Sequence, residues 1–165
     1  PNSARSEVIN PLMHIISSKD SFWIIDSKHA LDPDSLFKTI YLTGNVIFNK
    51  YDNNQINEVK IVTTEAIIYP DDEIIETDKY ATIVTPNSKT SGNGVIANMK
   101  KGQIKILSNA KRLSVSDDRT EQLEGERMLY DLKKKTWVLL KKEMQNDKIK
   151  IKDRVKTILR TRKAE

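Results

Sequence analysis

Apolar and polar side chains alternate along most of the chain, with the two-residue period that is typical of β-strands. The clearest case lies between residues 40 and 48, where one alternating set is apolar and the other is mostly polar. The apolar set consists of Ile40, Leu42, Val46 and Phe48. A strand would direct these four side chains to one face, whereas an α-helix would spread them around its axis. The pattern therefore predicts a strand with one apolar face, in which Gly44 would leave a gap between the apolar side chains.

Clusters of turn-forming residues separate the alternating stretches at short, regular intervals. Asp, Asn, Pro and Gly recur in them because these residues adopt turn dihedrals or bond to their own backbone. The clusters are Asp32-Pro33-Asp34, Asp52-Asn53-Asn54, Pro70-Asp71-Asp72, Pro86-Asn87-Ser88, Lys101-Gly102, Ser116-Asp117-Asp118, Tyr130-Asp131 and Gln145-Asn146-Asp147. This spacing favours long strands joined by tight turns.

An internal repeat supports the same architecture. Segments 27–42, 64–77 and 124–139 each begin with a polar-led strand, continue through a turn that contains Asp, and return in an apolar strand. The period is roughly 28 to 37 residues, the size of one hairpin per repeat. Stacked hairpins predict an all-β antiparallel fold, a jelly roll or twisted open β-sandwich, whose inner faces form one apolar seam. We expect residues 1–165 to form a single domain of this kind.

Composition narrows the class of protein. The chain has 165 residues, of which 38% are hydrophobic and 31% charged, enough for one domain with a core. No run approaches the roughly 18 to 20 apolar residues that span a bilayer. Cysteine is absent, which excludes disulfides and thiolate metal sites within this sequence.

The positive charge is concentrated toward the C-terminus. Residues 130–165 contain thirteen Lys or Arg against five Asp or Glu, whereas the rest contains 15 against 18. In segment 148–160, Lys and Arg alternate with apolar residues, which predicts a strand with one cationic face. Such a face would suit phosphate, nucleic acid or lipid headgroups, or it would simply be solvated.

A search for catalytic chemistry finds none that is specific. His14 and His29 have no neighbouring ligands at metal-site spacing, so we expect no metal site. Segment 91–94, Ser-Gly-Asn-Gly, lacks the Gly-Lys-Ser/Thr of a phosphate loop. Gly92 and Gly94 are better explained as structural residues that let a strand bend; if Gly92 has a positive φ, valine there should distort the strand. With no nucleophile motif either, we expect a protein that is not an enzyme and needs no cofactor.

Several segments, in their order and spacing, resemble the LptC family of lipopolysaccharide export proteins. They are residues 23–25, 42–46, 63–71, 76–78, 91–99 and 106–110, and the resemblance covers about residues 11–113. It implies a periplasmic β-jelly roll that receives lipopolysaccharide from an inner-membrane ABC transporter. The domain would relay the lipid to the bridge protein LptA by edge-to-edge strand pairing, and an inner-membrane anchor helix would precede Pro1.

Residues 114–165 extend past the end of many relatives. The hairpin signals at 123–126 and 130–131 look more like those of LptA, so an LptA-like bridge protein is an alternative. A nucleic-acid-binding β-domain that uses segment 130–165 is a second alternative, although no aromatic residue follows Trp137 to stack on bases. A repeat scaffold without a ligand is a third.

The expected lipid-binding trough lies on the apolar parity of the strands. Its candidate residues are Trp23, Ile40, Leu42, Val46, Phe48, Ile83, Val95, Ile104 and Ile106. Because the side-chain period is two, a register error of one residue would turn a whole set outward.

Overall fold

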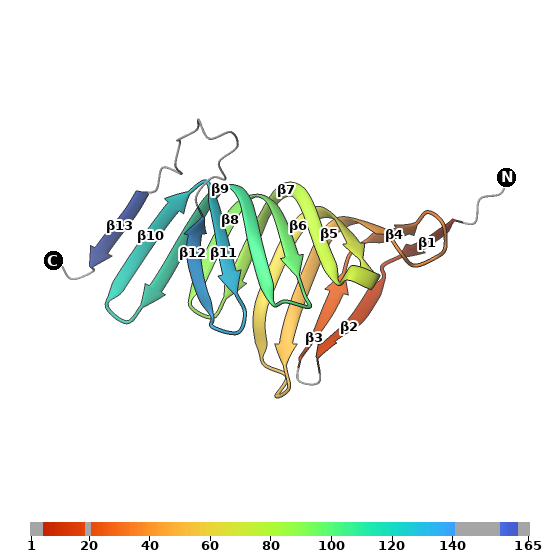
Figure 1. Ribbon diagram of the computed structural model, residues 1–165, viewed down its shortest axis with the longest axis horizontal. Helices are drawn as coiled ribbons and strands as arrows, with labels where there is room; N and C mark the ends of the chain where they lie inside the picture. The colour runs from red at the N-terminus through yellow and green to blue at the C-terminus, as the bar shows by residue number, and fades with distance from the viewer. Residues whose placement is uncertain (1–4, 19–20, 141–155, 162–165) are drawn as a thin grey trace.

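The computed structural model describes residues 5–18, 21–140 and 156–161. These residues form one antiparallel sheet of thirteen strands (Figure 1), with a single short 3-10 helix, η1. The elements are β1 (Ser6–Ile9), β2 (Leu12–Ser18), β3 (Ser21–Asp26), β4 (His29–Asp32), β5 (Ile40–Asp52), β6 (Asn57–Tyr69), η1 (Pro70–Asp72), β7 (Ile74–Thr85), β8 (Ser88–Asn98), β9 (Gln103–Ser116), β10 (Arg119–Gly125), β11 (Arg127–Asp131), β12 (Thr136–Leu140) and β13 (Lys156–Thr161). The all-β prediction is confirmed.

The five longest strands, β5 to β9, form a meander in which each strand pairs with the next. Predicted turn clusters lie at each connection: 52–54, 70–72, 86–88 and 101–102. The Asp52 carboxylate accepts backbone hydrogen bonds from Asn54 and Ile56, which is why Asp begins this turn. The predicted turn at 145–147 lies outside the described residues.

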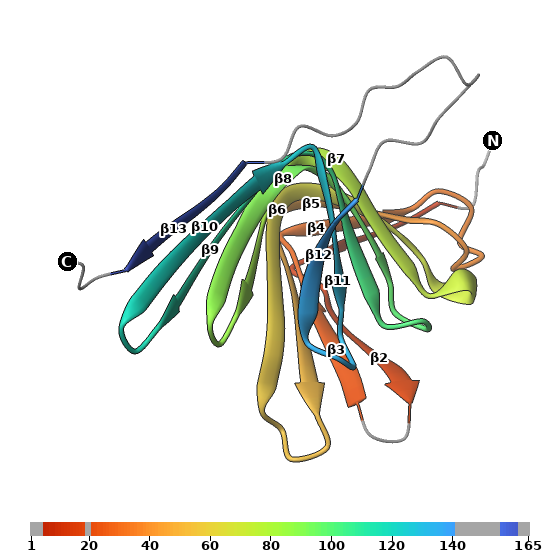
Figure 2. The same ribbon diagram turned by 60° about the vertical axis from the view of Figure 1, so that its left-hand side comes forward.

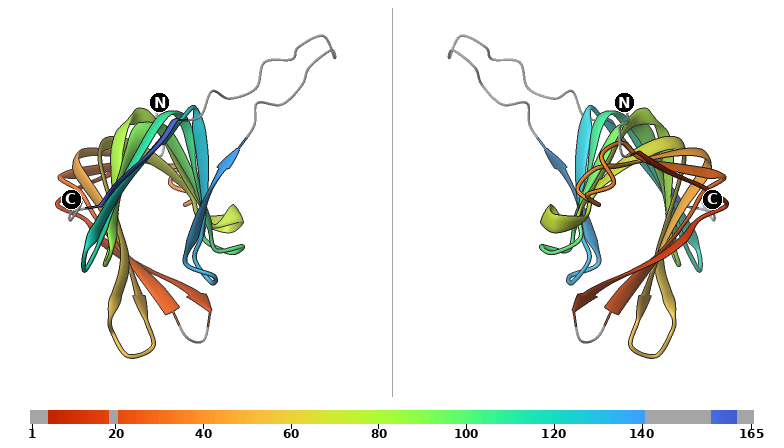
Figure 3. Two further views of the ribbon diagram at one scale, coloured as in Figure 1. Left: turned by 90° about the vertical axis from the view of Figure 1, so that its left-hand side faces the viewer. Right: turned by 90° about the vertical axis from the view of Figure 1, so that its right-hand side faces the viewer.

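The sheet folds over itself along its middle. Viewed down the long axis, the long strands run over a crest and descend as two facing arms, and β2 and β3 run beneath the space between them in this view (Figure 3). The short strands pair with halves of the long ones: β4 and β11 with the first arm, β3 and β10 with the second. Strands β1 and β12 then complete the first arm, whereas β2 and β13 complete the second (Figure 2).

Register shifts at the crest explain the fold of the sheet. Each pairing among β5 to β9 is interrupted there, for example between Thr43 and Val46 on β5. Left-handed residues occupy these positions: Gly44 has a φ of 87°, Asn45 of 48° and Asn109 of 52°. Glycine and asparagine tolerate this region best, and such bulges bend a strand sharply.

Gly92 and Gly94 serve the bend in different ways. The positive φ considered for Gly92 is found at Gly94 instead, at 83°. Gly92 is required for space, because a Cβ there would lie 2.3 Å from Cγ2 of Ile106 and 2.9 Å from the carbonyl oxygen of Ser108. The expected gap at Gly44 is absent, since a Cβ there would lie 2.7 Å from Cβ of Lys28.

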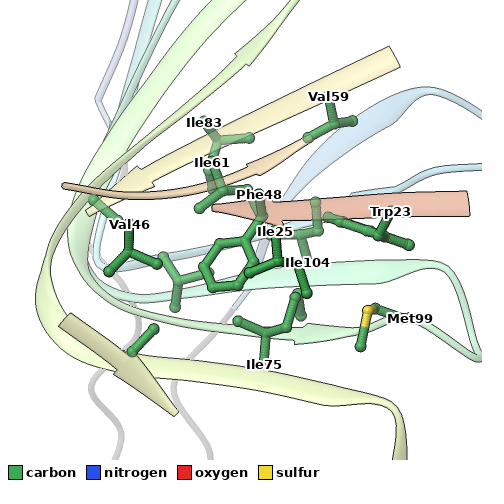
Figure 4. Packing of buried hydrophobic residues seen from close by; sticks show 14 of the residues in the cluster. Trp23, Ile25, Val46, Phe48, Val59, Ile61, Ile75, Ile83, Met99 and Ile104 are labelled. Atoms are coloured by element: carbon green, nitrogen blue, oxygen red, sulfur yellow. The ribbon is translucent and has the colours of Figure 1, made fainter. Parts of the chain in front are cut away.

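The core fills the space between the arms (Figure 4). Apolar side chains from both arms contact one another there, and the largest fully buried ones include Trp23, Phe48 and Met128. Of the predicted cationic strand 148–160, residues 156–160 lie on β13, which pairs with β10; residues 148–155 lie outside the described residues.

Candidate functional site

The interior between the arms holds all nine residues that the sequence suggested for the trough. Each of them is at most 3% exposed, and all belong to the same core cluster. Five lie in the first arm, namely Ile40, Leu42, Val95, Ile104 and Ile106, and the other four in the second. Their predicted parity is correct. The apolar seam runs across every long strand and continues into β3 and β11 through Trp23, Ile25 and Met128.

The seam is packed rather than open. Figure 4 shows side chains from several strands, among them Phe48, Ile25, Ile75 and Ile104, meeting in the space between the arms. Interiors of this kind are filled at nearly crystalline density. An apolar ligand between the arms would therefore displace or spread these side chains.

A charged cluster joins the two arms across the opening. Glu58, at a bulge of β6 in the second arm, hydrogen-bonds Lys50 of β5 and receives a second bond of 3.2 Å from Nζ of Lys135 in the β11–β12 turn. Lys50 and Glu58 side chains are only 11% and 17% exposed. Burial raises the pKa of Glu58, but the hydrogen bonds from Lys50 and Lys135 outweigh it, so the pKa lies below its ordinary value. We call this cluster the Glu58 bridge.

The Glu58 bridge borders a hollow of about 440 Å³ at the mouth of the interior. Besides the bridge itself, Lys100 and Lys133 line it, and Asp52 adds a second carboxylate. The phenol of Tyr130 lies near the same cluster: burial raises its pKa, and the charge of Glu58 raises it further. The mouth thus combines an apolar floor with a rim rich in lysine.

Sequence reasoning missed Lys50, Glu58 and Lys135. Lys50 shares the parity of Phe48, so it could have been placed on the inner face of β5. Its partner could not, because Glu58 reaches that face only through the register shift between Lys50 and Tyr51.

The sheet ends in edge strands at both ends. Within the described residues, β1 and β2 each pair with one strand only, and so do β12 and β13. Exposed apolar side chains accompany these edges, notably Val8 and Ile9 on β1, Leu12 on β2 and Val138 on β12. Unpaired edges of this kind can add a strand from another chain.

The two histidines lie apart from any cluster of ligands. The ring of His14 stacks on Phe22, and His29 lies 3.8 Å from Glu7. Over residues 5–18, 21–140 and 156–161, no group of three His, Cys, Asp or Glu side chains could hold a metal ion. In the same ranges no helix has the length and apolar character needed to cross a membrane.

Comparison with known proteins identifies what the chain is similar to. Residues 1–115 match the family model described as lipopolysaccharide-assembly, LptC-related. Among solved structures, the fold is similar to LptH of Pseudomonas aeruginosa, described as the LptA-homologous periplasmic component of the lipopolysaccharide transport device. The TM-score is 0.59 at 12% identity, over 92% of this chain and 96% of that one. No curated protein sequence matches the chain.

Proposed function

The chain belongs to the LptC-related family of lipopolysaccharide-assembly proteins, and from that premise we propose that it binds lipopolysaccharide between its two arms and relays it across the periplasm. Its role thus lies in lipopolysaccharide transport. The lipid would come from an inner-membrane ABC transporter and pass to an LptA-like bridge protein. The relay needs no catalytic chemistry, so in this proposal the protein does not act as an enzyme.

One observation carries the proposal: an apolar seam that crosses every long strand of a single sheet and runs toward unpaired edges at both ends. Acyl chains need a continuous apolar surface, because burial of each CH₂ group is worth about 0.8 kcal/mol. Among the described strands, no pairing joins the lower margins of the two arms, so the arms can part to admit acyl chains. The lysines at the mouth suit phosphorylated sugars at the rim.

The edges supply the partner contacts in this proposal. At one end, β1 and β2 would pair with the transporter, and at the other, β12 and β13 would pair with the bridge protein. Backbone pairing would continue the sheet from one protein into the next and align their apolar seams. An inner-membrane anchor preceding Pro1 would hold the domain beside the transporter.

A photo-crosslinking pair tests lipid binding in the seam. A benzophenone amino acid replaces Phe48, whose side chain is fully buried, or Tyr41, which lies on the outer face of the same strand and is 40% exposed. Asn45 also lies between Val46 and Gly44 on this strand, but it is unsuitable as a control because a bulky residue would strain its φ of 48°. We expect lipopolysaccharide adducts from position 48 only. A third variant replaces Trp137, which is partly buried at the edge of the core, and still tests lipid contact if the substitution at position 48 disrupts folding.

Equal yields of adduct at positions 41 and 48 would contradict the proposal that lipid contacts only the inner face of β5. Absence of adducts at positions 48 and 137, in folded protein, would favour a scaffold without a ligand.

The bridge role is the second candidate, because the sheet has unpaired edges at both ends and could pair with further copies of itself. Sedimentation over a range of concentrations distinguishes the two roles. Open-ended growth would favour a bridge protein, and a stable monomer would favour the role next to the transporter.

A further inference from the structure

Two polar residues interrupt the apolar inner face near one end of the second arm. Thr90 on β8 lies directly opposite Arg112 on β9, and on the far side of Arg112 lies Leu123 of β10. Directly paired residues of neighbouring strands point to the same face. Thr90 is 0% exposed and Leu123 packs against the core, so Arg112 shares the inner face with them.

One polar atom of each residue is buried without a hydrogen-bond partner among the described residues. The hydroxyl oxygen of Thr90 and Nε of Arg112 are buried, and neither forms a hydrogen bond with any described residue. Leaving such a donor unsatisfied costs about 1 to 3 kcal/mol, and folded proteins rarely tolerate two side by side without a reason. A ligand with hydrogen-bond acceptors could therefore satisfy the Thr90 hydroxyl and Nε of Arg112.

The charge of Arg112 is also uncompensated by close contact. Burial lowers the pKa of this guanidinium, and the nearby charge of Glu121 offsets this only in part; the group still stays protonated at neutral pH. The carboxylate of Glu121 lies 3.7 Å from Nη1 of Arg119 instead. Among the described residues, no carboxylate comes within ion-pair distance of Arg112.

A hollow opens beside Arg112. It measures about 620 Å³, and its lining includes the two cations Arg112 and Arg119 and the two carboxylates Asp117 and Glu121. An anion that entered it would meet the guanidinium of Arg112, whose inner-face neighbours are Thr90 and Leu123.

We propose that Arg112 and Thr90 bind a phosphate group of the transported glycolipid, at the point where the apolar seam meets this hollow. The proposal rests on the proposed function and specifies where the headgroup lies. A guanidinium binds phosphate oxygens through two parallel N–H donors, and the Thr90 hydroxyl adds a third donor. A phosphorylated acyl-glucosamine places its phosphate next to its acyl chains, which matches a cation bordering an apolar seam.

The test compares two lipids on the full chain. One is an acylated glucosamine disaccharide bisphosphate, and the other is the same lipid without phosphate; affinities come from displacement of a fluorescent probe. We expect the wild type to bind the phosphorylated lipid about tenfold more tightly than the phosphate-free lipid. A factor of this size corresponds to one charge-assisted hydrogen bond. Arg112→Gln should abolish that preference without weakening binding of the phosphate-free lipid.

Three further variants sharpen the result. Arg112→Lys should restore only part of the preference, because lysine cannot form the paired contact. Thr90→Val keeps the shape of the side chain and removes its donor, so it should reduce the preference by a few fold. Arg119→Gln is the matched control, since Arg119 lines the same hollow but lies near Glu121; it should leave the preference unchanged.

Several outcomes would overturn the proposal. Equal weakening of both lipids by Arg112→Gln would mean that Arg112 only supports the fold. An unchanged preference in that variant, in protein with wild-type thermal stability, would exclude a phosphate contact. If inorganic phosphate binds at Arg112 but Arg112→Gln leaves the lipid affinities unchanged, the site binds free anions and not the lipid. Failure of the wild type to bind either lipid would instead refute the proposed function itself.

Discussion

Gly92→Ala is the substitution whose outcome the structure constrains most closely. The added Cβ would lie 2.3 Å from Cγ2 of Ile106 and 2.9 Å from the carbonyl oxygen of Ser108. The first contact is with a fully buried side chain and the second with backbone, so neither group can simply swing into solvent. Strands β8 and β9 must therefore separate near the crest to admit one methyl group.

The expected cost follows from what is known of overpacked cores. Added methyl groups in well-packed sites destabilise by about 1 to 3 kcal/mol. In a domain of this size, each kcal/mol lowers the midpoint of thermal unfolding by about 2 to 4 °C. We expect Gly92→Ala to fall near the upper end of the range, because side chain and backbone are both contacted.

Urea denaturation of a double-mutant cycle isolates the cause. Ile106→Ala removes Cγ2 and is itself destabilising by about 2 to 5 kcal/mol through the cavity it leaves. In that background, Gly92→Ala should cost clearly less than it does in the wild type, since the remaining conflict is with Ser108 alone. Additive costs would show that Ile106 is not the obstacle and would refute this account of why glycine is needed.

Three further predictions concern the bend, the bridge and the edges. Gly94→Ala should destabilise by about 1 to 2 kcal/mol through its positive φ, and Ile106→Ala should not relieve that cost in the same denaturation assay. Because the folded-state pKa of Glu58 is lowered, its stabilising contribution is present above the ordinary value of 4.5 and is lost as the pH falls through the folded value. Glu58→Gln should thus lower the free energy of unfolding at pH 7, and the difference from wild type should narrow in melts below pH 4.5; a constant difference would contradict a charge effect. A benzophenone at exposed Val138 on β12 should capture the bridge protein, whereas one at Tyr80, exposed in the middle of the sheet, should not; equal capture would count against edge pairing.

Alternation and turn chemistry were sufficient to predict much of the fold. The parity of Ile40, Leu42, Val46 and Phe48 is correct even though a bulge lies among them, because two left-handed residues, Gly44 and Asn45, return β5 to the same face. The Asp-led turns were visible because their carboxylates bond nearby backbone N–H groups. Such signals are local and therefore readable from sequence.

The crest was much harder to predict. On β6, Thr63 and Ala66 both face inward although they are an odd number of residues apart, so strict alternation places one of them wrongly. Likewise, β10 and β11 pair with the two halves of β9; the signal at 123–126 includes the break at Gly125, but it does not show which half of β9 each strand joins. Register shifts depend on neighbouring strands, and a pattern within one strand does not contain them.

Polar residues of the interior were missed for a related reason. Thr90 and Arg112 have inward parity, but a polar residue in an alternating strand is ordinarily assigned to the solvent face. Only the pairing of Thr90 with Arg112, and the burial of both polar groups, distinguishes them from surface residues.

The interrupted pairing at the crest also has a mechanical consequence. Since the ladders of β5 to β9 are already broken there, the arms can tilt apart through small changes in five strands, and no strand must give up its pairing within either arm. The crest would therefore act as a hinge line, and most of the bending of the sheet would occur there. Under the proposed function, lipids with few or many acyl chains would be accommodated by different angles between the arms. The hydrogen bond between Lys135 and Glu58 would have to break before the arms separate.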